Sequence, residues 1–476
     1  MSDTHATLTA RISAVLARVV PDFRRLIAAE RLSGGASQET YKLRIDSTRG
    51  EIQLALRRAA GGAPMSRDEG QVGLVTEALM LQAAANAQVP VPTVLTVLTA
   101  NDGLGDGFVM SWLEGETLGA RLVRAASLAD IRPQLAFQCG QILARIHAID
   151  VVASGLAERL EVVTPSALIQ RTWQRYQGFA TPQPMIDYTA RWLLANLPPP
   201  CPPRLVHGDF RNGNLMVTPR GIAAVLDWEI AHRGDPLRDL GWLCTNSWRF
   251  GATEKPVGGF GEVADLIAGY TAESGQPIAP AAIHFWQVFG SFWWAVGCLS
   301  MAAHFRAGPD QTVERPAIGR RSSECQIDCV NLLLPGTTEI VSQNPPPLAD
   351  ELPRIDELLI SVCDFLRTDV MAATQDRTQF LARVAANSLD IVAREVALGP
   401  LLAHREQARL ENLLGRRDSL ANLRWQLVRG LREGQLALDS PALIEHLRAT
   451  VVNQALLDQP SYSGCKTALS HCTQSM

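Results

Sequence analysis

The spacing of apolar residues predicts a sheet-rich first third of the chain. Near the start, apolar positions recur every three or four residues, which predicts an amphipathic helix. Alternating patterns then predict strands at 41–45, 52–56, 94–98 and 107–112, and helical spacing predicts one helix at 73–86. This order is typical of a mixed, mostly antiparallel sheet that carries one long helix.

From about Leu118 onward the apolar spacing becomes helical. It predicts helices at 132–147, 166–176 and 186–195, and several more between 239 and 334. A short region of strands and turns, residues 205–227, interrupts them. A sheet-rich lobe followed by a helical lobe with such an interruption predicts two lobes around a cleft.

Composition divides the chain further. Residues 336–350 contain three consecutive prolines and several small polar residues, which is typical of a linker. We therefore predict a sheet-rich lobe at 1–115, a helical lobe at 116–335, a helical bundle at 351–460 and a flexible polar tail at 461–476.

Charge and cysteine content limit the class of protein. The net charge of −4 over 476 residues comes without a basic run, which argues against a nucleic-acid partner. The longest apolar stretch, 292–303, is shorter than the about 20 residues that span a bilayer, so we expect a buried helix and no membrane partner. Nine scattered cysteines and no recognisable secretion signal predict reduced thiols and a cytoplasmic location.

Candidate chemistry is concentrated in the region 205–227. A short apolar strand leads into His207-Gly208-Asp209, Asn214 begins a second strand, and a third strand ends at Asp227. Phosphoryl transfer needs a carboxylate that accepts the hydroxyl proton, and oxygen ligands for Mg²⁺. Asp209, Asn214 and Asp227 supply these groups in the order and spacing of a kinase catalytic loop and metal-binding aspartate.

Structural alternatives exist for each of these residues taken singly. An aspartate at the end of a strand often only caps the next turn, and a histidine before a catalytic loop is more often a packed support than a proton carrier. Three polar residues in kinase order between apolar strands rarely arise as caps, so the set favours a kinase-type site. The sequence contains no GxxxxGK[ST] motif, which excludes a P-loop enzyme.

The same region resembles the aminoglycoside phosphotransferase/choline kinase superfamily. The resemblance rests on His207-Gly208-Asp209 with Asn214, on Leu226-Asp227-Trp228-Glu229, and on Gly234-Asp235-Pro236 with Asp239-Leu240. Three further runs resemble the branch that includes the kinase-like domains fused to acyl-CoA dehydrogenases: Ser33 to Ser37 with Thr40-Tyr41, Leu56-Arg57-Arg58, and Gly319-Arg320-Arg321 with Glu324. The resemblance covers roughly residues 10 to 335. It implies an α+β, bilobal protein-kinase-like fold, followed here by a small all-α domain that resembles an uncharacterised helical domain.

The resemblance implies a role for each matching residue of the catalytic region. Asp209 would be the catalytic base, and Asn214 and Asp227 would bind the Mg²⁺ that accompanies ATP. His207 would support the loop, and Asp239 would hold the backbone of the loop by hydrogen bonds.

The resemblance also implies a nucleotide site. Arg57 stands where the family usually has a lysine on the α- and β-phosphates, and Glu77 would be its ion-pair partner. Because arginine presents a planar fork and lysine a point charge, we expect nucleotide geometry to differ at this position. The other implied nucleotide-binding residues are Gly34, Gly35, Ala36 and Ser37 in a flap over the phosphates, and Met110 and Trp112 near the adenine.

The leading hypothesis is an ATP- and Mg²⁺-dependent phosphotransferase that acts on a hydroxyl of a small molecule. Aromatic residues crowd the helical lobe without an acidic cluster, which favours a hydroxyacyl-type or other weakly charged alcohol. One alternative is a nucleotide-binding regulatory or interaction module with little activity, and another is an aminoglycoside-type antibiotic kinase. We also expect that the C-terminal helical domain either gates the cleft or forms a homodimer.

Overall fold

The structure is a computed structural model that describes residues 5–32, 38–59, 71–308, 311–341 and 353–473. Contacts divide the chain into two compact units, which are treated separately below. The first unit consists of Met1–Thr164, Pro199–Cys244 and Trp248–Trp286, and the second of Pro165–Pro198, Thr245–Ser247 and Gln287–Met476.

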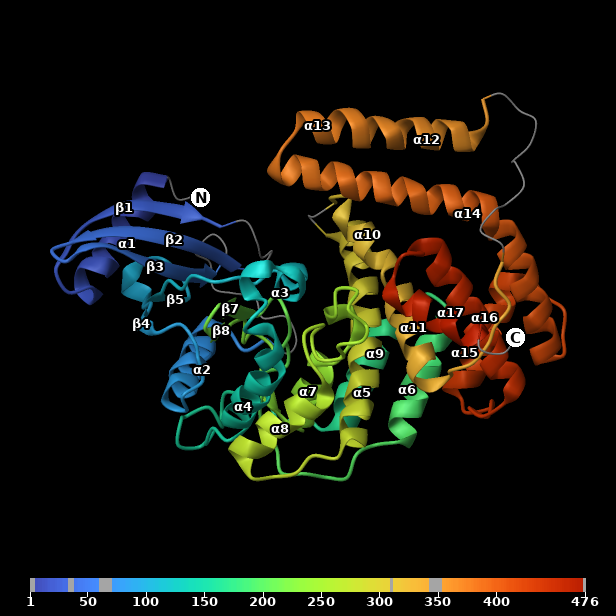
Figure 1. Cartoon of the computed structure of the whole chain (residues 1–476), viewed down its shortest axis with the longest axis horizontal. Coiled ribbons are helices and arrows are strands. Elements are labelled where there is room, and N and C mark those ends of the chain that lie inside the picture. Colours follow the sequence, from blue (N-terminus) through green and yellow to red (C-terminus); the bar gives the residue numbers. More distant parts are fainter. Residues whose placement is uncertain (1–4, 33–37, 60–70, 309–310, 342–352, 474–476) are drawn as a thin grey trace. The chain divides into compact units, whose positions relative to one another are not determined.

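A five-stranded antiparallel sheet forms the sheet-rich lobe of the first unit (Figure 1). The strand order is β1-β2-β3-β5-β4. The predicted strands are present, and the structure adds β1, which lies at the edge of the sheet and has no fully buried residue. The alternation of polar and apolar residues therefore could not reveal it. The strands are β1 (Phe23–Arg31), β2 (Gln38–Ser47), β3 (Gly50–Ala59), β4 (Val94–Val97) and β5 (Gly107–Ser111).

The two faces of this sheet have different neighbours. Leu54 and Leu56 of β3 belong to a core cluster that includes the buried side chains of α1 (His5–Val19). Successive residues of a strand point to opposite faces, so Arg57 lies on the other face with Ala59. Ala59 packs in the cluster that contains α2 (Leu74–Asn86). This arrangement directs Arg57 toward the helix that carries Glu77.

The rest of the first unit consists of helices and two short hairpin-like sheets that carry the catalytic region. Strand β6 pairs antiparallel with β9, and β7 pairs antiparallel with β8. The α+β kinase-like class predicted from the sequence is confirmed. The elements are α3 (Gly119–Arg124), α4 (Leu135–His147), β6 (Arg204–Val206), β7 (Leu215–Thr218), β8 (Gly221–Val225), β9 (His232–Gly234), α7 (Leu237–Leu243) and α8 (Val263–Ser274), with short 3-10 turns η2 (Ala100–Asp102), η3 (Ala126–Leu128) and η4 (Arg132–Gln134). A further turn, η5 (Asn246–Trp248), has its first two residues in the second unit and its last in the first.

Among the residues that the structure describes, the second unit consists of helices and the loops that connect them. One apolar cluster joins Tyr188 of α6, Ile327 of α11 and Leu427 of α15. Composition predicts a linker at 336–350, whereas here helices on both sides of that segment share one core. The elements are α5 (Pro165–Gln177), α6 (Pro184–Ala195), α10 (Glu314–Arg320), α11 (Ser322–Leu333), α12 (Ile355–Phe365), η6 (Leu366–Val370), α13 (Met371–Ala373), α14 (Asp376–Leu414), α15 (Leu420–Arg432), α16 (Pro441–Asp458) and α17 (Ser463–Thr473).

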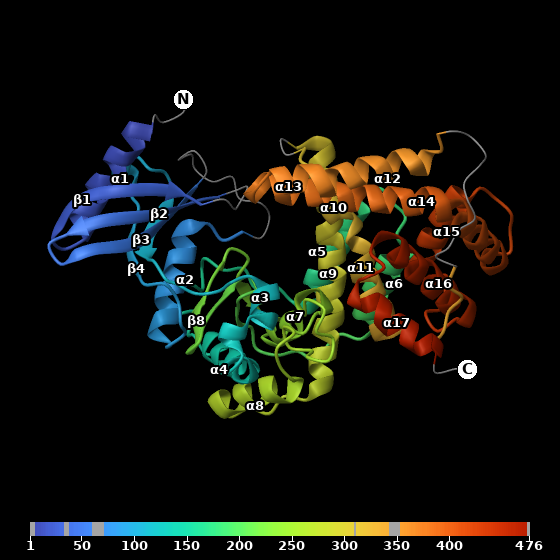
Figure 2. The same cartoon turned by 45° about the horizontal axis from the view of Figure 1, so that its top comes forward.

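Two features of the second unit bear on the sequence predictions. Residues 461–476 were expected to form a flexible tail, but α17 occupies most of this segment and buries Cys465 and Ala468. Their three-residue spacing forms a short apolar stripe that the polar composition concealed. Helix α12 lies beside α14 (Figures 1 and 2) and exposes Leu358 and Phe365. A homodimer through this domain stays a prediction.

Helix α9 (Pro280–Ala307) is longer than its central apolar stretch suggests. Among the described residues it is the one helix long and apolar enough to cross a membrane, which for a single helix is weak evidence. Half of its most apolar window is buried. Phe289 and Phe292 are almost fully buried, which agrees with the core helix predicted from the sequence.

Candidate active site

The β7–β8 hairpin brings two of the predicted site residues together. Leu215 pairs with Val225, so Asn214 and Leu226 continue the ladder at its open end. The Leu226 N–H donates to the Asn214 carbonyl oxygen at 2.8 Å. Asp227 follows directly with a φ of 64°, a left-handed conformation that strains a side-chain-bearing residue by about 1–3 kcal/mol. Such strain is concentrated at functional sites.

Asp209 receives hydrogen bonds from three side chains. The Trp242 indole N–H and the Arg211 Nε–H donate to Oδ1 at 2.8 and 2.9 Å, and the Asn214 amide donates to Oδ2 at 2.6 Å. A carboxylate oxygen accepts about two hydrogen bonds, so Oδ1 is saturated and Oδ2 keeps one acceptor position within the described residues. The side chain is 15% exposed. Oδ2 is therefore the atom of Asp209 that can accept a further proton donor.

His207 connects the Asp209 loop to the Asp227 loop. Its Nδ1 accepts from the Asp209 backbone N–H at 3.1 Å, so its Nε2 carries the proton and donates to the Leu226 carbonyl at 3.1 Å. Burial lowers the pKa of His207, with nearby carboxylates acting in the opposite direction. A neutral imidazole is the form that this pair of hydrogen bonds requires. These two hydrogen bonds join the Asp209 loop to the end of β8, and the supporting role of His207 stays a prediction.

Asp239 holds the start of the same loop. Its two oxygens accept the His207 and Gly208 backbone N–H groups, each at 2.8 Å, and Oδ2 also lies 3.1 Å from His147 Nε2. Burial alone would raise the pKa of Asp239, but the His147 contact and nearby positive charge lower it to about 2. The carboxylate therefore stays ionised and fixes the backbone before the catalytic loop.

Arg57 contacts Glu77, as the sequence suggested, and it also contacts Asp227. Its Nη1 lies 3.2 Å from Glu77 Oε1 and its Nη2 lies 2.8 Å from Asp227 Oδ1. The Arg57 Nε also donates to the side-chain oxygen of Gln38. The carboxyl of Glu77 is buried, and burial raises its pKa to about 7 although Arg57 opposes the shift. The additional contact places a guanidinium beside a predicted metal ligand.

Three acidic side chains of the described residues lie near Arg57. Carboxyl oxygens of Glu77, Asp227 and Glu229 lie 3.2, 2.8 and 4.0 Å from nitrogens of its guanidinium. Asp227 and Glu229 are 33% and 30% exposed, so added cations can reach them. The side-chain nitrogen of Asn214 donates to Asp209, which leaves the side-chain oxygen of Asn214 available as a metal ligand. This donor set of carboxylate and amide oxygens fits Mg²⁺.

A closed protein cage for a metal is not found among the described residues. They contain no group of three or more His, Cys, Asp or Glu side chains arranged to hold an ion. Mg²⁺ usually binds through one or two carboxylates and completes its shell with water and substrate phosphates. Asn214 and Asp227 match that kind of site.

The other predicted nucleotide-binding residues occupy varied positions. Met110 is a half-buried residue of β5 that packs against the core of the first unit. Trp112 follows β5; its indole N–H donates to Glu114 at 2.6 Å, and Lys42 Nζ lies 4.4 Å from the ring centre. Gly34, Gly35, Ala36 and Ser37 lie outside the described residues.

Sequence reasoning did not identify three side chains of this cluster. Arg211 and Trp242 contact Asp209, and Glu229 lies near Arg57. Arg211 stands inside the motif, two residues after Asp209, and Glu229 stands two residues after Asp227, so the motif contained both signals. Trp242 belongs to α7, and no local pattern predicts that its indole reaches back 33 positions along the chain.

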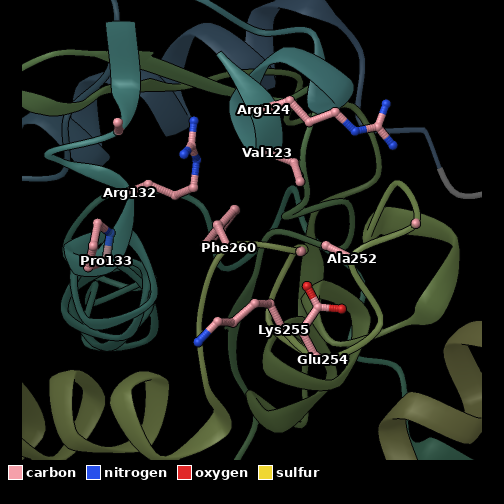
Figure 3. Close-up of a pocket in the computed structure, with 11 residues that line it drawn as sticks. Val123, Arg124, Arg132, Pro133, Ala252, Glu254, Lys255 and Phe260 are labelled. Carbon is pink, nitrogen blue, oxygen red and sulfur yellow. The ribbon is translucent and has the colours of Figure 1, made fainter. Parts of the chain in front are cut away.

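A separate cavity of about 510 Å³ lies in the first unit between α3, η4 and the loop that leads to α8 (Figure 3). Its basic side chains have partners: Arg124 donates to Phe250, Arg132 to Leu122 and Ala125, and Lys255 to Glu262. Gly259 lines the cavity, and the neighbouring carbonyl of Gly258 accepts from the Asn212 amide at 2.6 Å. The loop thus contacts the catalytic region on one side and the cavity on the other.

Comparisons with known proteins identify the family of the chain. Residues 28–275 of the 476 match the phosphotransferase enzyme family, APH. The chain belongs to this family. Residues 372–462 match a domain of unknown function, DUF6285, which confirms the additional helical domain. The phosphotransferase enzyme class predicted from the sequence is likewise confirmed.

Curated relatives confirm the predicted branch. Acyl-CoA dehydrogenase family member 10 of Mus musculus is 30% identical over 218 residues, 44% of this chain and 19% of that protein. Family member 11 of Homo sapiens is 25% identical over 361 residues, 68% of this chain and 43% of that protein. The chain thus matches less than half of the length of these relatives.

A solved structure confirms the fold. A Ralstonia eutropha protein assigned as an aminoglycoside phosphotransferase superposes with a TM-score of 0.55 at 21% identity. The match covers 68% of this phosphotransferase and 97% of that chain.

Proposed function

We propose that this phosphotransferase moves the γ-phosphate of ATP to a hydroxyl of a small, weakly charged alcohol, with Asp209 as the base. The observation that carries the proposal is the hydrogen bonding of Asp209: Oδ1 is saturated by Trp242 and Arg211, while Oδ2 keeps an open acceptor position. A carboxylate held in this way can accept the proton of an attacking hydroxyl without reorienting. The acceptor oxygen forms its bond to the γ-phosphorus, the bond to the β-phosphate oxygen breaks, and the products are ADP and a phosphate monoester.

Asn214 and Asp227 would hold Mg²⁺ with the nucleotide phosphates. The metal would offset the negative charge of the phosphates, which is its usual contribution in this chemistry. The partly exposed carboxyl groups of Asp227 and Glu229 near Arg57 support this assignment, since added cations can reach them. Asp227 Oδ1 accepts from Arg57, so its Oδ2 is the atom assigned to the metal.

Arg57 would also bind the nucleotide phosphates. In the structure its guanidinium bridges Glu77 and Asp227, which holds it at the base of the site. A planar fork can bind two phosphate oxygens at once, whereas lysine supplies a point charge. Because Nη1 and Nη2 each carry two N–H groups, one on each nitrogen would remain for a phosphate beside the contacts with Glu77 and Asp227.

Calorimetric titration of the full chain with a non-hydrolysable ATP analogue tests the proposal. We expect the wild-type protein to bind the analogue only when Mg²⁺ is present. Asp227→Asn should lose most of the affinity for the analogue, and the remaining binding should no longer depend on Mg²⁺. Asp209→Asn is the matched control, because it removes the same charge from a residue assigned to the base; its nucleotide affinity should change less than about threefold. Absence of Mg²⁺-dependent binding in the wild-type protein would contradict the proposal.

A nucleotide-binding module with little activity is the second candidate. The contact between Arg57 and Asp227 favours it, because a guanidinium occupies one oxygen of the proposed metal ligand. The two candidate functions predict different results in a phosphate-transfer assay. Nucleotide binding without phosphate transfer to any alcohol in a broad metabolite screen would support the module.

A further inference from the structure

The side chain of Asn246, the first residue of η5, is held by three other side chains of the second unit. Its nitrogen donates to Asp328 Oδ1 at 2.8 Å and to the Tyr462 hydroxyl oxygen at 3.2 Å. The Tyr462 hydroxyl donates to Asp328 Oδ2 at 2.7 Å, and the Ser463 hydroxyl donates to Asn246 Oδ1 at 3.2 Å. Both ends of the Asn246 amide are therefore fixed, by α11 and by the turn that leads into α17.

This cluster is buried, so the loss of one hydroxyl group should disturb it. Asp328 is 3% exposed. Burial and the nearby carboxylate of Asp328 raise the pKa of the Tyr462 hydroxyl well above its usual value, so the hydroxyl keeps the proton that it donates. A buried carboxylate that loses a donor bears a larger penalty than an exposed one, because water does not replace the donor. The position of Asn246 therefore depends on the Tyr462 hydroxyl.

A glycine allows the same turn to approach Asp328 closely. A Cβ atom at Gly464 would lie 2.8 Å from Asp328 Oδ1 and 2.9 Å from the ring of Tyr462, which is a clash with both. The Gly464 carbonyl also accepts from the Asn331 side chain of α11 at 2.9 Å. The turn is thus packed tightly against the helix that carries Asp328.

The last residue of η5, Trp248, contacts the catalytic loop within the first unit. Its carbonyl oxygen accepts from the Asn212 side-chain nitrogen at 3.0 Å. The centre of its ring lies 4.3 Å from the guanidinium carbon of Arg211, a cation–π distance. Arg211 in turn donates to Asp209 Oδ1 at 2.9 Å. The backbone and the ring of Trp248 therefore both support the loop that carries the proposed base.

A second route leads from Trp248 to Asp209 through Trp242. The two indole rings lie 5.0 Å apart between centres and meet edge to face. The Trp242 indole N–H donates to Asp209 Oδ1 at 2.8 Å. Both donors to Oδ1 thus touch the ring of Trp248, so a displaced ring would change the orientation of the carboxylate.

One backbone turn joins the two sets of contacts. The turn η5 consists of Asn246, Ser247 and Trp248, and its first and last residues are two peptide bonds apart. A 3-10 turn advances by only about 2 Å per residue, so a shift of Asn246 is passed along the backbone to Trp248.

We propose that the C-terminal helical domain holds the catalytic loop in its working conformation through Tyr462, with η5 as the connecting segment. Tyr462 lies at the end of the match to DUF6285, so the inference assigns a function to a domain that had none. It rests on the proposed function for the role of Asp209. Tyr462 acts through Asn246 and Trp248 and is therefore a positioning residue.

The first test observes the indole N–H of Trp242 by NMR in the full chain with isotope-labelled tryptophan, with Trp242→Phe to assign the signal. We expect Tyr462→Phe to move this signal, because the neighbouring ring of Trp248 changes position. Asn246→Ala is the second variant and should move it in the same direction.

Tyr176→Phe is the matched control. It also removes a buried hydroxyl that donates to a carboxylate of the second unit, that of Asp187, at 3.0 Å. Its loss of thermal stability should be similar to that of Tyr462→Phe, whereas the Trp242 signal should stay in place. The control thus separates positioning of the loop from a general loss of stability.

The second test measures labelled phosphate monoester formed from γ-labelled ATP and a mixture of small hydroxylated metabolites. Tyr462→Phe should lower the rate at saturating ATP about 2- to 30-fold, the range expected for coupling through a packed network. The KM for ATP should change less than about twofold, and Tyr176→Phe should keep the wild-type rate. Adding Tyr462→Phe to Asn246→Ala should lower the rate little further, because both act through the same contact.

An unmoved Trp242 signal in both variants would overturn the inference. So would an equal movement in Tyr176→Phe, or a moved signal with an unchanged rate of transfer. If the wild-type protein formed no monoester, the proposed function would fail, whereas the NMR comparison would still decide whether Tyr462 influences the loop.

Discussion

Asp187 in the second unit and Asp209 in the first accept hydrogen bonds from similar side chains, but we assign them different roles. Asp187 accepts from the Trp173 indole, the Tyr176 hydroxyl and the Arg432 guanidinium, at 2.7, 3.0 and 2.8 Å. Arg432 also lies over the ring of Tyr176, as Arg211 lies over that of Trp248. Each carboxylate thus contacts one tryptophan and one arginine that is stacked on an aromatic ring.

The two residues differ in saturation and in access. A second donor from Arg432 reaches Asp187 Oδ2 at 3.5 Å, so each oxygen of Asp187 has two donors, and the side chain has no exposed surface. Asp209 keeps one open acceptor position and is 15% exposed. A saturated, buried pair stabilises the fold, whereas a carboxylate with one free position can take part in chemistry. Residue types alone do not make this distinction.

Asp209→Asn should give the largest effect of this comparison. An amide cannot accept the acceptor proton, so we expect kcat to fall about 10²- to 10⁴-fold. The melting temperature should stay close to that of the wild-type protein, because the isosteric side chain keeps most of its contacts. Steady-state ADP formation and thermal unfolding measure the two quantities. A large loss of stability would instead place Asp209 with Asp187 among the structural carboxylates.

Asp187→Asn should give the converse result. It leaves the Arg432 guanidinium without its partner, and breaking a buried ion pair costs about 3 kcal/mol of unfolding free energy. Urea unfolding measures this loss, while kcat per folded molecule should be unchanged. The double variant Asp187→Leu with Arg432→Met is the control, because it removes both charges and should recover much of the stability. Lower kcat at full stability would contradict a structural role.

The pH dependence of stability should reflect the support around Asp209. His207 has a lowered pKa, so its stabilising contribution is present above about pH 6.5 and is lost as the pH falls. Asp239 has a pKa lowered to about 2, so its contribution is present above about pH 3.8 and is lost as the pH falls through 2. Together they predict a decrease in unfolding free energy on acidification, with about 2 kcal/mol from Asp239. Asp239→Asn should remove the lower part of this dependence, and an unchanged curve would refute the assignment.

Glu77→Gln should have the smallest effect. The pKa of Glu77 is already raised to about 7 by burial, so near neutral pH the carboxyl carries its charge only about half of the time. Replacing it with a neutral amide therefore removes little, and we expect the KM for ATP to rise less than about fivefold with kcat nearly constant. A loss of kcat comparable to that of Asp209→Asn would show that the charged form is essential.

The sequence indicated the parts of the candidate site that depend on local order, and the roles of these residues stay predictions. Asp209, Asn214 and Asp227 follow from strand ends and spacing, and the hairpin register brings the last two together. The sequence did not predict contacts between segments that are far apart along the chain. The approach of Trp242 to Asp209 and the pairing of Asp187 with Arg432 depend on tertiary packing. The edge strand β1 and helix α17 were missed because their local patterns are weak.

The most direct measurement of the central claim is phosphate transfer by wild-type protein and Asp209→Asn with γ-labelled ATP, Mg²⁺ and a mixture of small hydroxylated metabolites. We predict a labelled phosphate monoester that requires Mg²⁺ and whose rate of formation falls at least about 100-fold in the variant. Equal rates in the two proteins, or Mg²⁺-dependent nucleotide binding without any labelled monoester, would contradict the assignment of Asp209 as the base of a phosphotransferase.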